Sequence, residues 1–424
     1  MDLFTKMFNH NMDEILQKIF LMLDPTSLHC SRQTSKQWNQ FIVNRIWGSK
    51  HGRKCLSKRL RQNWVRAKPS IQIRDYWDQM FVYSNSFSID NRLLVCGLSH
   101  VGEGGAKVIE QCTGDIIATL DHNFESQNKK CVRRVALTNK FIATLCGKVL
   151  CIWNKDTRHL ITKEELGDRF LDSNVDLEAS ENLIVLANKN YHDQIFVWRL
   201  IESHLSLVRE FKNDSQISPT FVLDSCRLGI ILEYNPATVQ LYELTELDSR
   251  EVFETETCFF DGFMTLKAFK FPYFAICQYS EIYIWNIESS SQLTYFNLGN
   301  YEMCCQLILN KNFFFINLIK DQSLWENFVS GEMRPSKQIL RWYQLEDFEK
   351  IEVENRKTVE DEQGIPRISP YLAKVLKNPS EIELSKRSGM EYTRDIVALS
   401  DTSIVHVADL GDAVTFYNFW SNSD

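Results

Sequence analysis

Residues that can act as acids, bases, nucleophiles or metal ligands are plentiful in this sequence, but their spacing groups none of them into a site. The nine histidines contain no His-x-x-x-His pair and the twelve cysteines contain no Cys-x-x-Cys pair, so the ligand spacings typical of zinc sites are missing. There is also no G-x-G-x-x-G after a strand, no P-loop and no G-x-S-x-G elbow. We therefore predict no catalytic residue, no metal and no cofactor.

Length and charge narrow the kind of protein further. With 424 residues, 44% of them hydrophobic, the chain can bury a large core in two or three domains or in one long repeat array. Its formal charge of -7 creates no field that would attract nucleic acid or an anionic membrane. Neither a membrane-spanning apolar run nor a secretory signal pattern is present. We expect a cytoplasmic and/or nuclear protein with reduced cysteines and no nucleic-acid or membrane partner.

The N-terminal region, residues 8–50, has the periodicity of three short helices. An amphipathic first helix is indicated by Ile15, Leu16, Ile19, Phe20 and Leu23. Asn11 and Glu14 have the spacing of a capping box at its start, Asp24-Pro25 can begin a second helix, and Ser35 can cap a third. Three such helices bury little surface by themselves. The module therefore either docks on a partner or caps the larger domain.

A series of short motifs runs through this module. They are Asp13-Glu14-Ile15-Leu16, Lys18-Ile19-Phe20, Leu23-Asp24-Pro25, Ser27-Leu28, Ser35-Lys36-Gln37-Trp38-Asn39 and Trp47. In order and spacing they resemble the F-box, by which substrate receptors dock onto the Skp-type adaptor of SCF-type cullin-RING ubiquitin ligases. The family usually has Leu-Pro where this chain has Asn11-Met12. The resemblance implies an adaptor-binding surface formed by Met12, Ile15, Leu16, Pro25 and Leu28.

A basic segment, residues 51–70, follows the helical module. Between Arg53 and Lys68 it carries seven Lys or Arg residues and no acidic residue, with Leu56, Leu60 and Trp64 at helical spacing. We interpret it as a helical connector that packs its apolar face on a neighbour and leaves its charges in water. A membrane-surface or nucleic-acid role is the alternative.

Beyond residue 70, short β-branched and aromatic runs recur at a nearly constant period. Strands that end in an aromatic residue lie at 150–153, 195–198, 239–242 and 282–285, so their last residues are 45, 44 and 43 positions apart. Ile109 fits one period earlier, and Trp342 and Tyr417 end similar strands at wider spacings of 57 and 75. A period of about 40–45 residues with four short strands each is typical of propeller blades.

In period and strand shape, residues 71–424 resemble a degenerate WD repeat, although the aromatic is never followed by Asp and no Gly-His pair occurs. The resemblance implies about seven blades, the last completed by a strand from the other end of the domain, for which Met80–Tyr83 is the candidate. The widened intervals around 346–390 predict loops inserted between blades, with a short helix at Pro370–Leu376. The predicted fold class is α plus all-β multidomain: a small three-helix module followed by a β-propeller.

Together the two resemblances imply an F-box/WD-repeat substrate receptor. Such a chain contacts the Skp-type adaptor and, through it, the cullin-RING ligase, and it holds a protein substrate, here unknown, on its propeller without doing chemistry itself. Some receptors of this class bind phosphorylated segments through arginines on one propeller face. The candidates for that role are Arg133, Arg134, Arg169 and Arg341.

Two other functions stay open at this point. Asn11-Met12 favours a propeller scaffold for protein–protein interaction that has no ubiquitin ligase role. An enzyme housed in the propeller is the second alternative, because a fold does not decide a function. Perturbed acids or histidines clustered in the central channel would favour the enzyme, whereas a wide apolar or charged rim would favour binding.

Overall fold

The computed structural model divides the chain into two compact units. The helical unit is Met1–Gln72 with Thr402–Ile404 and Phe416–Asp424, and the sheet unit is Ile73–Asp401 with Val405–Thr415. Apart from single-residue gaps, the structure describes residues 12–23, 34–47, 70–75, 87–97, 105–122, 132–167, 175–188, 194–212, 220–232, 237–244, 249–257, 265–278, 281–298, 302–320, 337–355, 379–384, 396–399, 403–407 and 413–418, and isolated positions at 7, 27, 28, 31, 49, 51, 52, 55, 58, 62, 64 and 170.

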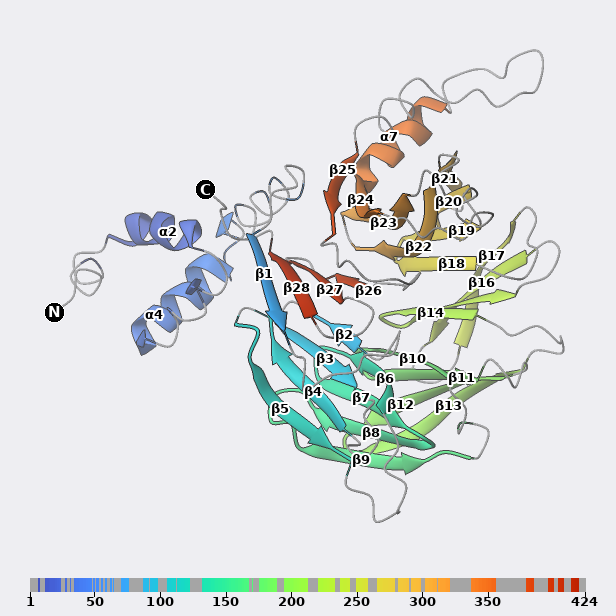
Figure 1. Ribbon diagram of the computed structural model, residues 1–424, viewed down its shortest axis with the longest axis horizontal. Helices are drawn as coiled ribbons and strands as arrows, with labels where there is room; N and C mark the ends of the chain where they lie inside the picture. The colour runs from blue at the N-terminus through green and yellow to red at the C-terminus, as the bar shows by residue number, and fades with distance from the viewer. Residues whose placement is uncertain are drawn as a thin grey trace, which may run out of the picture. The chain divides into compact units, whose positions relative to one another are not determined.

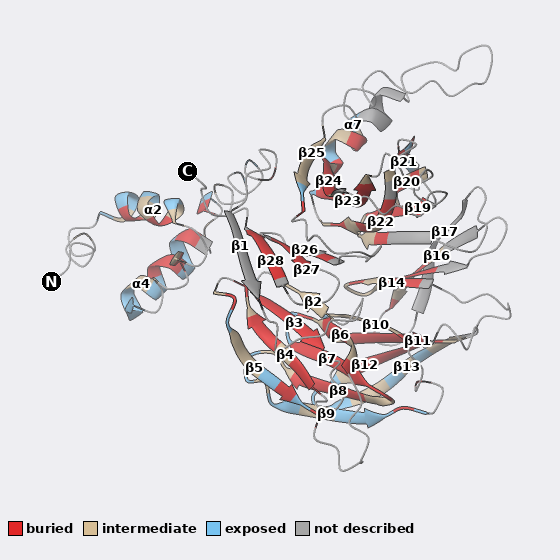
Figure 2. Ribbon diagram, in the orientation of Figure 1, coloured by how far each residue is buried: buried red, intermediate tan, exposed pale blue. Residues whose placement is uncertain are grey.

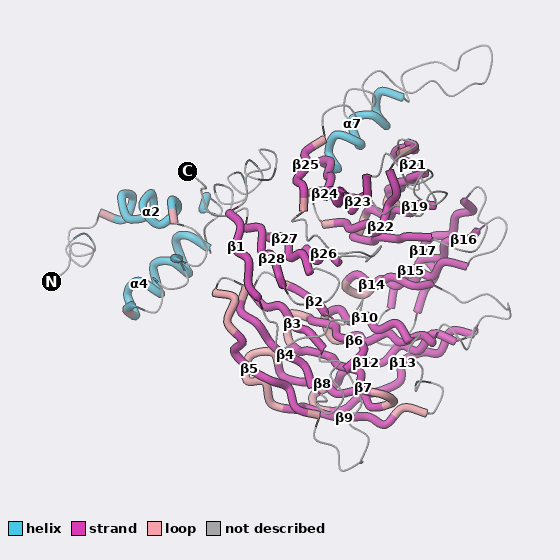
Figure 3. The backbone as a smooth tube through the Cα atoms, viewed as in Figure 1, coloured by secondary structure: helices cyan, strands magenta, loops and turns pink. Residues whose placement is uncertain are grey.

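The helical unit contains α2 (Asp13–Met22) and α4 (Lys36–Phe41), which continues as the π-helix η1 (Ile42–Trp47) (Figure 3). As predicted, the Ser35 side chain caps α4 by accepting a hydrogen bond from the Trp38 amide at 3.1 Å. The predicted capping box is replaced at the start of α2 by Met12, which makes no side-chain cap. Further on, the described residues 55, 58, 62 and 64 of the predicted connector are helical, and Trp64 is buried.

The strands form four-stranded sheets, which we number in chain order (Figure 1). Sheet 1 contains β2 (Phe87–Ile89), β3 (Leu93–Gly97), β4 (Gly105–Glu110) and β5 (Ile116–Asp121). Sheet 2 contains β6 (Val132–Leu137), β7 (Phe141–Cys146), β8 (Val149–Asn154) and β9 (Leu160–Glu165). Sheet 3 contains β10 (Val175–Ser180), β11 (Leu183–Asn188), β12 (Gln194–Ile201) and β13 (His204–Lys212). Sheet 4 contains β14 (Thr220–Asp224), β15 (Arg227–Leu232), β16 (Ala237–Leu244) and β17 (Ser249–Thr257).

The remaining sheets follow the same order with one exception. Sheet 5 contains β18 (Thr265–Lys270), β19 (Tyr273–Gln278), β20 (Glu281–Asn286) and β21 (Ser291–Asn297). Sheet 6 contains β22 (Glu302–Leu309), β23 (Phe313–Lys320), β24 (Lys337–Gln344) and β25 (Ser380–Glu383). Sheet 7 has the order β26 (Ile396–Leu399), β27 (Ser403–Val407), β28 (Ala413–Asn418), β1 (Ser70–Asp75). Its outer strand therefore comes from the other end of the domain, as predicted, but it is Ser70–Asp75; Met80–Tyr83 lies outside the described residues.

The first strands of successive sheets form a closed ring. Each of β2, β6, β10, β14, β18 and β22 contacts the first strand of the next sheet, and β26 contacts β2. Second strands lie between two junctions and are buried on both faces, as β7 is, whereas the fourth strand β9 is mostly exposed (Figure 2). Antiparallel four-stranded sheets arranged radially in this way are a β-propeller. The described strands make seven such sheets; the number of blades in the whole chain stays a prediction.

The position of the recurring aromatic, which is held by Ile109 in sheet 1, marks a β-bulge. In sheets 1 to 5 the register between the third and fourth strands shifts immediately before Ile109, Trp153, Trp198, Tyr242 and Trp285. A bulge at this point increases the local twist of the sheet. Each of these residues pairs with the second residue of the neighbouring second strand. In sheet 6 the second residue of the second strand is Phe314, and Phe314 pairs with Tyr343. The aromatic of this repeat is therefore Tyr343 and not the predicted Trp342.

Short polar side chains fix the hairpin turns in place of the missing Asp of the WD dipeptide. Asn154 Oδ1 accepts hydrogen bonds from the amides of Asp156 and Thr157, both at 2.9 Å. Asn286 does the same two and three residues further on in sheet 5. Asn side chains form such turns readily because their oxygen reaches the backbone two residues ahead. The turn therefore survives the loss of the WD dipeptide.

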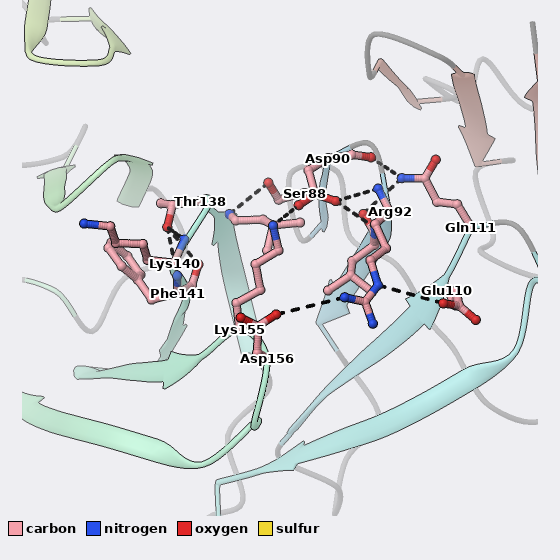
Figure 4. Close-up of polar contacts among 12 residues, drawn as sticks. Ser88, Asp90, Arg92, Glu110, Gln111, Thr138, Lys140, Phe141, Lys155 and Asp156 are labelled. Carbon is pink, nitrogen blue, oxygen red and sulfur yellow. Dashed lines mark hydrogen bonds and ion pairs between the residues drawn. The ribbon is translucent and has the colours of Figure 1, made fainter. Parts of the chain in front are cut away.

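Polar groups also join neighbouring sheets. Asp90, in the turn after β2, accepts hydrogen bonds from the amides of Arg92 at 2.8 Å and Leu93 at 2.7 Å, and it forms an ion pair with Lys155 of sheet 2 (Figure 4). At four junctions, a backbone amide of one sheet donates to a side chain of the preceding sheet: Leu137 to Ser88, Leu223 to Glu178, Phe271 to Asp224 and Val397 to Gln306. These bonds fix neighbouring sheets against each other at the four junctions.

The acid-rich insertion lies inside a sheet and not between blades as predicted. Residues Leu345–Asn355 form the helix α7, which connects the third strand of sheet 6 to its fourth strand. Its Phe348 is fully buried against Phe296 of β21 and Tyr343 of β24. The predicted helix at Pro370–Leu376 lies outside the described residues.

Asp90→Ala should lower the free energy of unfolding by about 2–3 kcal/mol, because it leaves two amides and a partly buried ammonium without their acceptor. Urea denaturation followed by tryptophan fluorescence measures the change. Asp156→Ala is the matched control, since the Asp156 side chain is exposed and its contact with Arg92 is at 4.0 Å. Equal effects of the two substitutions would contradict the assigned role of Asp90.

Candidate protein-binding site

Helix α2 is held in the helical unit by one apolar face. Leu16 and Phe20 are buried against a set of apolar residues from the following helices: Leu28, Phe41, Ile42 and Ile46. The Phe20 ring also meets the Trp38 ring edge to face, with centroids 5.4 Å apart. On the polar side, the Gln17 amide nitrogen donates to the Arg45 carbonyl at 3.0 Å, and Arg45 lies 3.5 Å from Asp13. These contacts orient α2 on η1.

A second face of α2 carries large apolar side chains that are exposed. Met12, Ile15 and Met22 are 42%, 49% and 74% exposed, and Ile19 between them is half-buried. Their spacing of three, four and three residues places them along one side of the helix. Val43 of η1 is also exposed. Exposed large apolar side chains gathered in this way are typical of a protein-binding surface.

The structure separates the five residues predicted for this surface. Met12 and Ile15 lie on it. Leu16 and Leu28 do not, because both are fully buried in the core of the unit; Pro25 lies outside the described residues. Sequence reasoning missed Met22, although its spacing of seven from Ile15 places it on the same helix face.

Of the four arginines predicted to bind a substrate, the three that the structure describes do not gather at one site. Arg341 makes a bidentate ion pair with Glu302 at 2.7 and 2.8 Å and a further one with Glu381. Arg134 lies 3.8 Å from Asp176 and is largely buried. Arg133 neighbours it on β6, and Arg169 lies outside the described residues. With two carboxylates on one guanidinium, Arg341 is already paired inside its sheet.

The pKa of Glu302 reflects the same cluster. Burial by itself raises the pKa of this carboxyl, but hydrogen bonds and charge from Arg341 and Lys320 hold it below its ordinary value. Lys320 lies 3.2 Å from Glu302 and 3.8 Å from Glu381. Arg341 and Lys320 thus neutralise the carboxylates of Glu302 and Glu381 within sheet 6.

Sheet 2 contains a buried network around the aromatic of its repeat. The Trp153 indole N–H donates to Thr144 Oγ1 at 2.9 Å, and Thr144 Oγ1 lies 2.9 Å from His122 Nε2. The imidazole also stacks on the indole, with centroids 5.5 Å apart. A polar network of this kind was not expected from a sequence without Gly-His pairs. Burial lowers the pKa of His122 to about 4, against the opposite effect of Asp121.

The described residues offer no group of three or more His, Cys, Asp or Glu side chains that could hold a metal ion. Several cysteines of the sheet unit are buried, and burial raises the pKa of Cys96 and of Cys151 to about 12. Among the described helices, none combines the length and the apolar character needed to cross a membrane.

A family model described as F-box-like matches residues 13–51, which include α2, α4 and η1. The comparison with curated proteins found no match. The family match and the exposed apolar side chains of α2 fall on the same segment of the chain.

Solved structures resemble the chain over most of its length. A chain of the crystal structure of the mitotic checkpoint complex is 12% identical, covers 84% of this chain and 93% of its own length, and gives a TM-score of 0.51. The WD40 domain of SCAP from fission yeast is 10% identical, with coverages of 83% and 98% and a TM-score of 0.47. Hsv2 of Kluyveromyces lactis is 14% identical, with coverages of 76% and 89% and a TM-score of 0.48. At such identities the likeness concerns the fold alone. The family match adds that an F-box-like segment precedes the β-propeller.

His122 should make the sheet unit less stable in acid. Its folded-state pKa near 4 is below the value of 6.5 for a free imidazole, so the unfolded chain takes up the proton first and stability falls as the pH drops from 6.5 to 4. In His122→Gln this contribution is absent. The free energy of unfolding of the wild type minus that of the variant, measured by urea titration, should therefore fall progressively from pH 7 to pH 4. A gap that stays constant would contradict the lowered pKa.

Proposed function

We propose that this chain is the substrate-recognition subunit of an SCF-type E3 ubiquitin ligase. The F-box-like module docks on a Skp-type adaptor, and the propeller holds a protein substrate. The observation that carries the proposal is the exposed apolar face of α2, formed by Met12, Ile15 and Met22, inside the segment that matches the F-box-like family. F-box segments in general bind Skp-type adaptors.

The energetics of this face support docking. Complete burial of a large apolar side chain contributes about 1.5–3 kcal/mol, and three such side chains are exposed on one helix. The helical unit already has its own core around Leu16 and Phe20, so the second face is free to enter a partner's groove without unfolding the module. Helices presented in this way bind as apolar anchors at regular spacing.

The proposed role needs no catalytic residue in this chain. A receptor that holds the substrate near a ubiquitin-conjugating enzyme raises the effective concentration of the substrate's lysine, which is a contribution of proximity and orientation. F-box and propeller proteins are generally non-catalytic adaptors. The neutralised pairs of Arg341 and of Arg134 favour substrate recognition by other residues of the propeller.

A second candidate function is a propeller scaffold without a ubiquitin ligase role. It is supported by the start of α2, where Met12 is the N-cap without a side-chain hydrogen bond and Asn11-Met12 stands in place of the family's Leu-Pro. The two candidates differ in one measurable property, the binding of the adaptor.

Full-length protein should bind a purified Skp-type adaptor in a pull-down, and the double variant Ile15→Asp, Met22→Asp should lose at least ten-fold in affinity. Two carboxylates would have to be desolvated in the apolar interface. Both positions are exposed, so the variant should keep its helical circular dichroism and its thermal midpoint.

The double variant Gln37→Asp, Gln40→Asp is the matched control, because it introduces the same two charges at exposed positions of α4. Leu16→Asp is unsuitable as a test, since it places a charge in the core. If the wild-type chain does not bind at micromolar concentrations, the ligase proposal is wrong and the scaffold becomes the better explanation.

A further inference from the structure

A histidine and a cysteine lie one helical turn apart in the segment that follows η1. His51 Nε2 is 3.5 Å from Cys55 Sγ. Both residues are helical, and their spacing of four places them on the same side of a helix. An imidazole within reach of a thiol is the arrangement that makes a cysteine nucleophilic, because the imidazole can take the proton of the thiol.

The backbone next to this pair is held closely against η1. Gly52 is buried, its amide donates to Ser49 Oγ at 2.9 Å, and the Ser49 hydroxyl donates to the Arg45 carbonyl at 2.5 Å. A Cβ atom at position 52 would lie 2.1 Å from the carbonyl oxygen of Ile46. Only glycine permits this approach, so the histidine that precedes it stands on a firmly placed backbone.

The pair is accessible to solvent. His51 is exposed and Cys55 is half-buried. Two cysteines of the sheet unit, Cys96 and Cys151, are buried instead, and burial raises their pKa values to about 12. Thiols of that kind stay protonated at neutral pH and react slowly. Cys226 is half-buried as well, but it packs against an apolar cluster of sheets 3 and 4.

Charge around the pair indicates the class of molecule that reacts with it. Lys58 is exposed and follows Cys55 by three residues, so the two lie on the same side of the helix. The sequence from Arg53 to Lys68 contains seven Lys or Arg residues and no acidic residue. Positive charge of this density attracts anions. A small disulfide that carries carboxylates, such as oxidised glutathione, is an anion and also an electrophile for a thiolate.

We propose that Cys55 is a modification site that forms a mixed disulfide with a small anionic disulfide of the oxidised-glutathione class. His51 takes the proton of Cys55, and the thiolate attacks one sulfur of the disulfide. A bond forms between Cys55 Sγ and that sulfur, the original S–S bond breaks, and the leaving thiolate receives the proton from His51. The Cys55 sulfur is oxidised and the departing sulfur is reduced, so the disulfide is the only co-reactant. This reaction does not depend on adaptor binding by α2.

Reduced full-length protein incubated with oxidised glutathione should gain a glutathionyl group at Cys55 before any other cysteine reacts. Intact-protein mass spectrometry measures the rate, and peptide mapping identifies the residue. His51→Gln should slow the reaction about ten-fold at pH 7, because an amide can donate to sulfur but cannot take up the proton. At about pH 9.5, where an ordinary thiol is ionised without help, the two proteins should react at similar rates. Position 51 is exposed, so the variant should keep its helical circular dichroism.

The role of charge is tested with Lys58→Glu, which should slow the reaction with oxidised glutathione several-fold and affect the uncharged hydroxyethyl disulfide much less. Lys36→Glu is the matched control, since it makes the same change at an exposed position of α4. The proposal is overturned if Cys55 reacts no faster than Cys226, or if His51→Gln leaves the rate at pH 7 unchanged. A rate that Lys58→Glu lowers equally for both disulfides would refute the anionic class of reactant.

Discussion

The ring of first strands is the constraint on which the sheet unit depends. Because β26 contacts β2, every sheet meets two neighbours, and its second strand is buried on both faces, as β7 and β23 are. A closed ring also leaves no sheet able to bury its faces alone. The outer strand of sheet 7 comes from Ser70–Asp75, so the two ends of the propeller sequence meet within one sheet.

Several junctions repeat the same solution with different residues. Sheets 1 to 5 place a bulky residue at the bulge, and at four junctions a side chain of the first strand accepts an amide hydrogen bond from the next sheet. Buried amides need such acceptors. Ser88, Glu178, Asp224 and Gln306 serve equally well because only the oxygen matters. This tolerance explains how the WD dipeptide is lost while the fold remains.

The proposed adaptor-binding surface consists of apolar side chains that the helical unit leaves exposed. On α2, one face is in the core of the helical unit and the neighbouring face is exposed. Surface that a fold leaves uncovered can be buried at little conformational cost when a partner arrives.

The helical module, the period of the propeller and the cap at Ser35 could be predicted from the residues alone, because these features depend on spacing along the chain. Spacing also identified Ile109 as an early repeat. Three features became visible only in the folded chain: Leu16 and Leu28 are core while Ile15 and Met22 are exposed, Tyr343 replaces Trp342, and Arg341 is neutralised by Glu302 and Glu381. Which face is covered, and which charge is paired, depends on residues distant in sequence, and hydrophobic periodicity carries no information about them.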